Sequence, residues 1–171
     1  MSFEPQPTLT STLVKLRPLC LNDKDKLFAV AADPLIWVQH PVQNRHTKKE
    51  FDNFFSESIK SGGALLVVDA NSNDVIGSSR FYGYDAEKSE VEIGWTFLAR
   101  SHWGGKYNAE LKRLMFEHAF KYVDTVVFYI DPENKRSQKS VEKIGGVRDS
   151  NLDGKGRVVY RVEATNYENT I

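Results

Sequence analysis

The feature that most constrains the fold is a strand-like run that leads through two glycines into a helix-like run. The run SEVEIGWTFLA (89–99) is rich in β-branched and aromatic residues, and a helix is expected directly after it, at about 105–122. Gly104 and Gly105 stand at the junction. A strand, a helix and a strand are expected next, at 125–130, about 133–144 and 156–164. This alternation predicts a mixed α/β sheet covered by helices.

The N-terminal half predicts two helices and an antiparallel meander. Thr47 followed by Glu50 is a capping box that starts one helix, and Asn22 is the expected N-cap of the other. The short turn NSND (71–74) separates two strand-like runs, so these runs and the next one should pair as neighbours. The expected strands lie at 12–19, 64–70 and 74–84, the helices at 22–33 and 47–63, and an irregular segment at 34–46.

Composition excludes several classes of function. Lysine plus arginine and aspartate plus glutamate number 23 each, and this balance argues against binding along a nucleic acid backbone. The single cysteine, Cys20, excludes an internal disulfide framework and a multi-cysteine metal site, and we expect no metal. No apolar run approaches membrane-spanning length, and the first residues lack a hydrophobic signal core. We therefore expect a cytoplasmic protein with no membrane partner, consisting of a flexible arm (1–11) and one domain (12–171).

The glycine pair offers a place for an anionic ligand. Backbone N–H groups at a helix N-terminus are unpaired and carry the positive end of the helix dipole, which suits phosphate oxygens. Gly104 and Gly105 would let a pyrophosphate approach closely, and Lys106 adds a cation nearby. A tight strand-to-helix turn that needs glycine is the alternative. The chain contains neither the Walker phosphate loop nor the glycine fingerprint of dinucleotide-binding folds.

Four short motifs follow one another in the C-terminal half. They are Glu92-Ile93-Gly94, Trp103-Gly104-Gly105-Lys106 before a helix that contains Glu110, Asn134-Lys135-Arg136-Ser137, and Lys143-Ile144-Gly145. Their order and spacing resemble the GNAT superfamily of N-acetyltransferases, in the branch with the Rim-type ribosomal-protein N-terminal acetyltransferases. The resemblance implies the fold of that family, a twisted and mostly antiparallel central sheet of about six to seven strands flanked by about four helices.

The resemblance also implies acetyl-CoA as co-substrate, held around the glycine loop. The family's phosphate loop usually reads Gln/Arg-x-x-Gly-x-Gly/Ala, and this chain has Ser101 and Lys106 at the first and last of these positions. Lys106 would either crowd the pyrophosphate or replace the missing arginine, and Arg100 could serve the same end. The expected donor-site residues are Phe97, Leu98, Ala99, Arg100, His102, Trp103, Gly104, Gly105, Lys106, Tyr107, Asn108, Asn134 and Ser137.

Glu92 is the candidate general base. Strict alternation along the strand would put Val91, Ile93, Trp95 and Phe97 on one apolar face, and Glu90, Glu92, Gly94 and Thr96 on the other. A carboxylate among glycine and threonine is placed to line a cleft. Amine acetylation needs a base, because an ammonium has no lone pair and a lysine amine has a pKa of ~10.4. A solvated strand face is the alternative for both glutamates, and we keep it for Glu90.

The resemblance places Ser137 close to the sulfur of the donor, and Asn134 against the pantetheine arm or an ordered water. Both residues also suit a purely structural role, Asn134 as a helix N-cap and Ser137 in the exposed first turn. The oxyanion would take backbone N–H donors near Phe97 and Leu98.

Weaker candidates for contact with the acceptor lie in the irregular segment and on the second strand of the meander. Trp37 and His40 belong to the segment, where helix packing is the alternative, and Arg80 and Tyr82 share a strand face, where a surface pair is the alternative. His118 falls on the apolar stripe of its helix, so we expect a core histidine.

The sequence thus predicts an N-acetyltransferase that moves an acetyl group from acetyl-CoA to a primary amine by direct attack in a ternary complex. The amine could belong to a protein N-terminus or to a small molecule, and a homodimer stays open. A catalytically silent acyl-CoA-binding module on the same fold is the alternative. A phosphate-binding module of unrelated chemistry would leave Glu92 and Ser137 unexplained.

Overall fold

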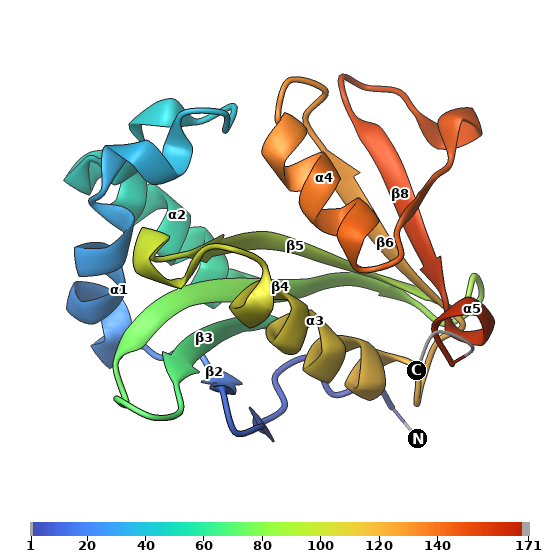
Figure 1. Cartoon of the computed structure of the whole chain (residues 1–171), viewed down its shortest axis with the longest axis horizontal. Helices are drawn as coiled ribbons and strands as arrows, with labels where there is room; N and C mark the ends of the chain where they lie inside the picture. The colour runs from blue at the N-terminus through green and yellow to red at the C-terminus, as the bar shows by residue number, and fades with distance from the viewer. Residues whose placement is uncertain (1, 169–171) are drawn as a thin grey trace.

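The computed structural model describes residues 2–168, and its strands form one sheet in the order β1-β2-β3-β4-β5-β6-β8-β7 (Figure 1). Every neighbouring pair is antiparallel except β5 and β6. The strands are β1 (Leu9–Thr10), β2 (Val14–Pro18), β3 (Ala64–Asp69), β4 (Val75–Asp85), β5 (Glu90–Leu98), β6 (Thr125–Ile130), β7 (Val147–Arg148) and β8 (Val158–Glu163). The predicted mixed, mostly antiparallel sheet is confirmed.

Five α-helices and several short 3-10 turns occur among the described residues. The α-helices are α1 (Lys24–Ala31), α2 (Lys48–Ser61), α3 (Lys106–Ala119), α4 (Lys135–Lys143) and α5 (Ala164–Glu168). The 3-10 turns are η1 (Leu21–Asp23), η2 (Pro34–Trp37), η3 (Gln43–His46), η4 (Arg100–His102) and η5 (Ser150–Leu152). The sheet has more strands than predicted because β1 and β7 have two residues each, too few to show a hydrophobic pattern.

Helix boundaries follow local capping chemistry. The Thr47 hydroxyl accepts a hydrogen bond from the Glu50 backbone N–H at 3.4 Å, and Gly62 ends α2 in a left-handed conformation, as predicted. The reciprocal half of the predicted capping box is not formed, because the Thr47 backbone N–H donates to the Asn44 carbonyl oxygen at 2.9 Å. Asn22, the expected N-cap of the first helix, lies instead inside η1. Asp23 begins α1 without a side-chain cap, because its carboxylate binds the Arg17 guanidinium and the Cys20 backbone N–H.

Two hydrophobic clusters cover the two faces of the sheet. The larger contains Leu111, Met115 and Phe116 from α3. The smaller contains Phe51, Phe54 and Phe55 from α2. The sheet therefore separates α3 from α2, and each face has its own core.

A β-bulge in β5 changes which side chains face each core. Arg80 of β4 pairs with Gly94, but Ser78 pairs with Phe97, so Trp95 and Thr96 together oppose one residue. Trp95 adopts a positive φ of 53° to make the extra step. The predicted alternation is right up to Gly94 and wrong beyond it. Val91 and Ile93 pack in the α3-side cluster, whereas Trp95 and Phe97 pack in the α2-side cluster. The extra residue of the bulge reverses which face of the sheet the following side chains point to.

The parallel pair β5–β6 is short. It consists of Glu90–Thr125, Val91–Val126 and Glu92–Val127. Beyond Glu92 the two strands diverge, and Figure 1 shows β6 and β8 leaning away from β5. The gap opens directly after the predicted base.

The N-terminal arm, expected to be flexible, lies against the domain over residues 2–11. The Phe3 ring stacks on Tyr84 and meets Phe81 edge-on. His118 is buried and its Nε2 lies 2.7 Å from the Glu4 carbonyl oxygen, so the expected core histidine is confirmed. Residue 1 of the arm and residues 169–171 of the domain lie outside the described residues.

Candidate active site

A cleft with a volume of about 680 Å³ fills the gap between β5 and β6. Its walls come from the second half of β5, the first turns of α3 and α4, the end of β6 and the segment that contains η2. The structure brings twelve predicted site residues to this cleft. They are Trp37, His40, Glu92, Phe97, Leu98, His102, Trp103, Gly104, Gly105, Asn108, Asn134 and Ser137.

The glycine loop presents the start of α3 to the cleft. Gly104 and Gly105 have φ values of 114° and 100°, a region that side-chain-bearing residues rarely adopt. A Cβ atom on either glycine would meet no atom within 4 Å, so the space beside the loop is open. The first N–H bond within the helix runs from Ala109 to the Gly105 carbonyl, which leaves the preceding amides without helical acceptors. These amides can bind a phosphate.

Asp69 at the end of β3 holds this loop in place. Its carboxylate accepts hydrogen bonds from His102 Nε2 at 2.9 Å, from the Tyr107 hydroxyl at 3.3 Å and from the Asn71 and Ser72 backbone N–H groups. The bond from His102 and these amides lower the pKa of Asp69 to about 2. Tyr107 therefore packs behind the loop, away from the cleft lining. Sequence reasoning missed Asp69, since a strand-end aspartate carries no signal of a partner 33 residues away.

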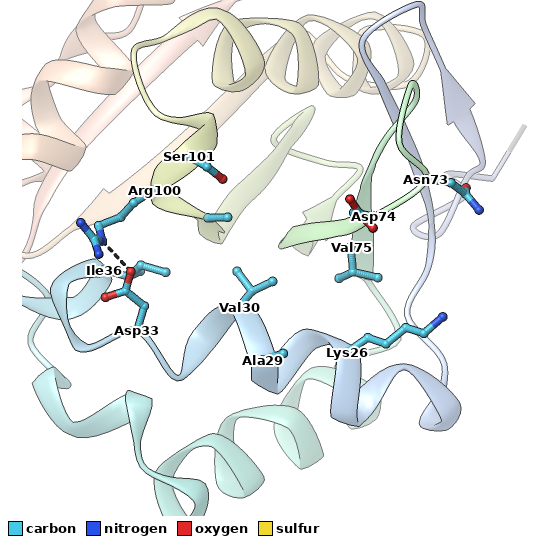
Figure 2. Close-up of a pocket in the computed structure, with 11 residues that line it drawn as sticks. Lys26, Ala29, Val30, Asp33, Ile36, Asn73, Asp74, Val75, Arg100 and Ser101 are labelled. Atoms are coloured by element: carbon cyan, nitrogen blue, oxygen red, sulfur yellow. Dashed lines mark hydrogen bonds and ion pairs between the residues drawn. The ribbon is translucent and has the colours of Figure 1, made fainter.

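Four of the predicted donor residues lie outside the cleft lining, namely Ala99, Arg100, Lys106 and Tyr107. Ala99 and Arg100 line a second cavity, between α1 and the loops at 73–75 and 99–101 (Figure 2). There the Arg100 guanidinium forms an ion pair with Asp33 at 2.5 Å. Arg100 is thus paired with Asp33 just after the end of α1, outside the cleft lining.

Glu92 lies half-buried in the cleft wall where β5 and β6 part. Its carboxylate makes no hydrogen bond or close ion pair with any residue in the described range 2–168. Burial raises its pKa to about 7, against the opposing pull of Arg157 and Arg80. A carboxylate that changes protonation near neutrality is suited to remove a proton from an amine. By contrast, the neighbouring Glu90 carboxylate lies 3.3 Å from the Arg161 guanidinium, which agrees with the structural role expected for it.

Asn134 and Ser137 sit at the start of α4, facing the cleft. Asn134 is the N-cap, and its Oδ1 accepts a hydrogen bond from the Ser137 backbone N–H at 3.2 Å. The capping role is therefore present, and it fixes the direction of the helix that carries Ser137. Beside them, the Asn108 amide donates to the Ser140 hydroxyl at 3.1 Å, which joins α3 to α4 across the floor of the cleft.

The side of the cleft formed by the segment that contains η2 is aromatic. Trp37 is buried, donates from Nε1 to the Ala31 carbonyl at 2.8 Å and packs on Phe97. Tyr82 is half exposed outside the lining, and its ring meets Trp95 edge-on. Arg80 is only 4% exposed, so the surface pair offered as its alternative role is wrong.

A family model described as an acetyltransferase (GNAT) domain matches residues 14–147. The chain belongs to the GNAT acetyltransferase family. The match begins with β2 and ends at the first residue of β7, so it leaves out β1 and β8. It includes the whole cleft lining except residues 156–157.

Solved structures of GNAT proteins share this fold at low sequence identity. An acetyltransferase from Agrobacterium tumefaciens is 25% identical with a TM-score of 0.71, covering 92% of this chain and 94% of that one. A protein described as a ribosomal-protein-serine acetyltransferase from Vibrio cholerae is 14% identical, with a TM-score of 0.74 and coverages of 94% and 99%. A spermidine N-acetyltransferase from Vibrio cholerae, solved with CoA and spermine, is 17% identical, with a TM-score of 0.69 and coverages of 93% and 100%. A search of curated proteins found no match.

Residues 2–168 contain no helix that is both long and apolar enough to cross a bilayer. Over the same range, histidine, cysteine and acidic side chains nowhere gather in the groups of three that could hold a metal ion.

Sequence reasoning also missed a buried lysine in this GNAT cleft. Lys112 of α3 is 4% exposed and donates from Nζ to the Thr96 hydroxyl at 2.7 Å, which in turn lies 2.8 Å from the Ser79 hydroxyl. Among the described residues it has no acidic partner. Burial alone lowers its pKa to about 7. No local signal reveals it, because a lysine on a helix is usually exposed.

Replacing Lys112 by Met should stabilise the protein at neutral pH, by about 2 kcal/mol once the lost hydrogen bond is subtracted. Because the folded-state pKa is lowered from 10.5 to about 7, the unfolded chain binds the extra proton in this window, and wild-type stability rises with pH across it. The advantage of the variant should therefore shrink between pH 7 and 10. Urea unfolding at both ends of this range measures it, with exposed Lys121→Met as the control. A destabilised variant at pH 7 would contradict this account.

Proposed function

We propose that the protein transfers an acetyl group from acetyl-CoA to a primary amine by direct attack in a ternary complex. The observation that carries the proposal is Glu92, an unpaired, half-buried carboxylate with a pKa of about 7 at the point where the sheet opens. The family membership and the free amides at the start of α3 support acetyl-CoA as the donor.

In this mechanism each part of the cleft has one task. Amides of the glycine loop and of α3 hold the pyrophosphate, so the thioester lies beside the β5 bulge. Glu92 takes the proton of the amine, directly or through a water, as nitrogen attacks the carbonyl carbon. Backbone N–H groups near Phe97 and Leu98 stabilise the oxyanion, and Ser137 gives a proton to the departing sulfur. A C–N bond forms and the C–S bond breaks, without a covalent enzyme intermediate.

Amine-dependent release of free thiol from acetyl-CoA tests the proposal. The free enzyme should release little thiol, and a suitable amine should raise the rate in proportion to its concentration before saturation. Calorimetric binding of acetyl-CoA with no thiol release from any amine would instead favour the catalytically silent module.

The finer assignment to the Rim-type branch is part of the proposal. It is supported by the four motifs and agrees with the fold of the ribosomal-protein-serine acetyltransferase. A peptide α-amine is the acceptor that this branch implies, and a small-molecule amine is the other acceptor that the sequence predicts. The neighbour solved with spermine shows that the same fold also holds a polyamine in that protein.

The two residues at the start of α4 should respond differently to substitution. Ser137→Ala should lower kcat several-fold with KM nearly constant, since solvent can still protonate the sulfur. Asn134→Ala should mainly raise the KM for acetyl-CoA and cost about 1 kcal/mol of stability, through loss of the cap.

Asn134→Asp is the matched control for this helix, because it keeps an oxygen acceptor for the Ser137 N–H but has no amide N–H to offer a ligand. It should retain stability and still raise KM. Steady-state kinetics and thermal unfolding of the three variants separate these effects. Normal kinetics with a common loss of stability would remove both residues from the site.

A further inference from the structure

Two neighbouring arginines lie at the part of the cleft lined by Trp37, Arg45 and Trp95, which we call the acceptor wall. Arg45 belongs to this lining, and Arg80 lies behind it. Arg80, on β4, is 4% exposed, and its guanidinium stacks on Trp95 at 4.2 Å. Arg45, at η3, lines the cleft and lies over the rings of Trp37 at 5.3 Å and Phe54 at 4.7 Å. The Arg80 guanidinium also lies 6.0 Å from the Phe54 ring, so one aromatic side chain contacts both cations.

Neither arginine has the partners that a buried guanidinium needs. The Nε atoms of both are buried without a hydrogen-bond partner. Arg80 donates from Nη2 to the Ser58 hydroxyl at 2.7 Å, and the structure gives its side chain no other hydrogen bond within residues 2–168. An arginine carries five N–H donors, so most of its capacity is unused.

The contact between Arg45 and His40 does not fill this need. Arg45 Nη1 lies 3.2 Å from His40 Nε2, while His40 Nδ1 accepts the Val42 backbone N–H at 2.9 Å. Burial lowers the pKa of His40 to about 4, so the ring is neutral. A neutral imidazole has one acceptor nitrogen and one N–H. With Nδ1 accepting, the Nε2 hydrogen faces the Arg45 donor, and both groups lack an acceptor.

No carboxylate neutralises the pair. Within the described chain neither arginine takes part in an ion pair, and Glu50, Glu57 and Glu92 act on them only at longer range. Burial and the neighbouring Arg80 lower the pKa of Arg45 to about 10. Two buried like charges without a counterion are costly, because an uncompensated buried charge loses its hydration without gaining a partner. A bound anion would relieve this cost.

The pair lies next to the proposed base. Arg80 is opposite Gly94 in the β4–β5 register, and the next pair on the same face is Tyr82 with Glu92. Gly94 has no side chain, so nothing from β5 stands between the Arg80 stem and the Glu92 carboxylate at that position. An acceptor could therefore place its amine at Glu92 and an anionic group at the arginines.

We propose that the acceptor is a compact amine that also carries a carboxylate, which Arg45 binds from the cleft lining while the charge of the buried Arg80 attracts it from behind. The proposal rests on the proposed function, because it names the substrate class of the same cleft. Arginine suits a carboxylate because its planar fork can donate two parallel hydrogen bonds. The same charges would repel a polycation, so this chain should differ from the neighbour solved with spermine.

Binding of unreactive, product-like ligands tests the inference without any need for turnover. The probes are N-acetylglycine, N-acetyl-β-alanine and N-acetyl-4-aminobutyrate, each paired with its carboxamide, measured by calorimetry with the protein saturated with CoA. At least one acid should bind roughly 10–100-fold more tightly than its amide, the range of a charge-assisted hydrogen bond. Acids that bind no better than their amides, or do not bind, would overturn the inference.

Substitution of Arg45 tests where the carboxylate binds. Arg45→Gln should abolish the preference for the acid while acetyl-CoA binding stays unchanged, because the substitution lies on the acceptor wall. Arg113→Gln is the control, since it removes the same charge from α3 outside the cleft lining. Acid preference that survives in a folded Arg45→Gln protein would contradict the assignment to Arg45.

Turnover separates this inference from the proposed function. Absence of thiol release with every amine would contradict the proposed function, whatever the binding data show. Equal thiol release with glycine, β-alanine and their carboxamides would contradict the inference alone. In each pair the compound with the carboxamide has the less basic amino group, so a larger fraction of that amino group is unprotonated and reactive. Faster thiol release with the acid would therefore occur despite this bias.

Discussion

Replacing Glu92 by Gln is expected to lower turnover by roughly 10²–10⁴-fold while acetyl-CoA affinity stays nearly constant. The amide keeps the shape of the carboxylate but cannot accept a proton. Since only the deprotonated carboxylate is active, the wild-type rate should rise with pH through an inflection near 7, the pKa that burial gives Glu92. The loss should shrink at alkaline pH, where more of the amine is already deprotonated. Steady-state rates between pH 6 and 9.5 measure both trends.

Glu90→Gln is the matched control, because it makes the same change two residues earlier on a carboxylate paired with Arg161. It should leave kcat and its pH profile unchanged.

Stability provides a second check on the protonation of Glu92. The folded-state pKa of Glu92 is raised from 4.5 to about 7, so the wild type loses stability as pH rises through that window, and the Gln variant should be at least as stable at pH 8. A rate loss independent of pH would indicate a positioning role for Glu92 and another base.

Replacing Gly104 by Val is expected to abolish measurable acetyl-CoA binding, a loss of about 100-fold or more. The added carbons would occupy the open space beside the loop, where the proposed pyrophosphate lies. The substitution also forces a β-branched residue to a φ of 114°, which costs stability on its own. Calorimetry with acetyl-CoA on the folded variant, below its melting temperature, measures the loss of binding.

Gly83→Val separates the two effects of that substitution. Gly83 has a φ of 60° and an equally open surrounding, but it belongs to β4 outside the cleft lining. The two variants should lose comparable stability, and only Gly104→Val should lose acetyl-CoA. Normal affinity in both would remove the donor site from this loop.

The order of the main elements could be predicted because their signals are local. Thr47, Glu50 and Gly62 specify α2 by hydrogen bonds within a few residues of each other. The run TVVFYI gives β6 at the predicted bounds because it consists of β-branched and aromatic residues, all of them buried except Tyr129. Glu92 could be singled out for a similar reason, as an acidic residue between the apolar Val91 and Ile93 in the middle of its strand.

The rest depends on contacts between distant parts of the chain. The bulge at Trp95 arises from the register of β5 on β4, which no pattern within β5 records. Lys112 is buried because α3 turns that face toward Thr96, and Arg45 meets Arg80 only after η3 folds against α2 and β4. Arg100 was a candidate phosphate contact from one residue before the motif position, but its side chain binds Asp33, 67 residues earlier in the chain.

The divergence of β5 from β6 lets main-chain groups, rather than side chains, form part of the cleft wall. Beyond Glu92, the backbone groups of β5 that would pair with β6 in a continuous sheet are available to a ligand in the cleft. Peptide N–H and C=O groups are the same in every residue, so evolution can exchange the side chains along this edge without altering what it offers. A recognition surface of this kind leaves no trace in residue identities. Proteins that share only 14–25% of their residues with this chain can therefore drift apart in sequence and keep the same fold.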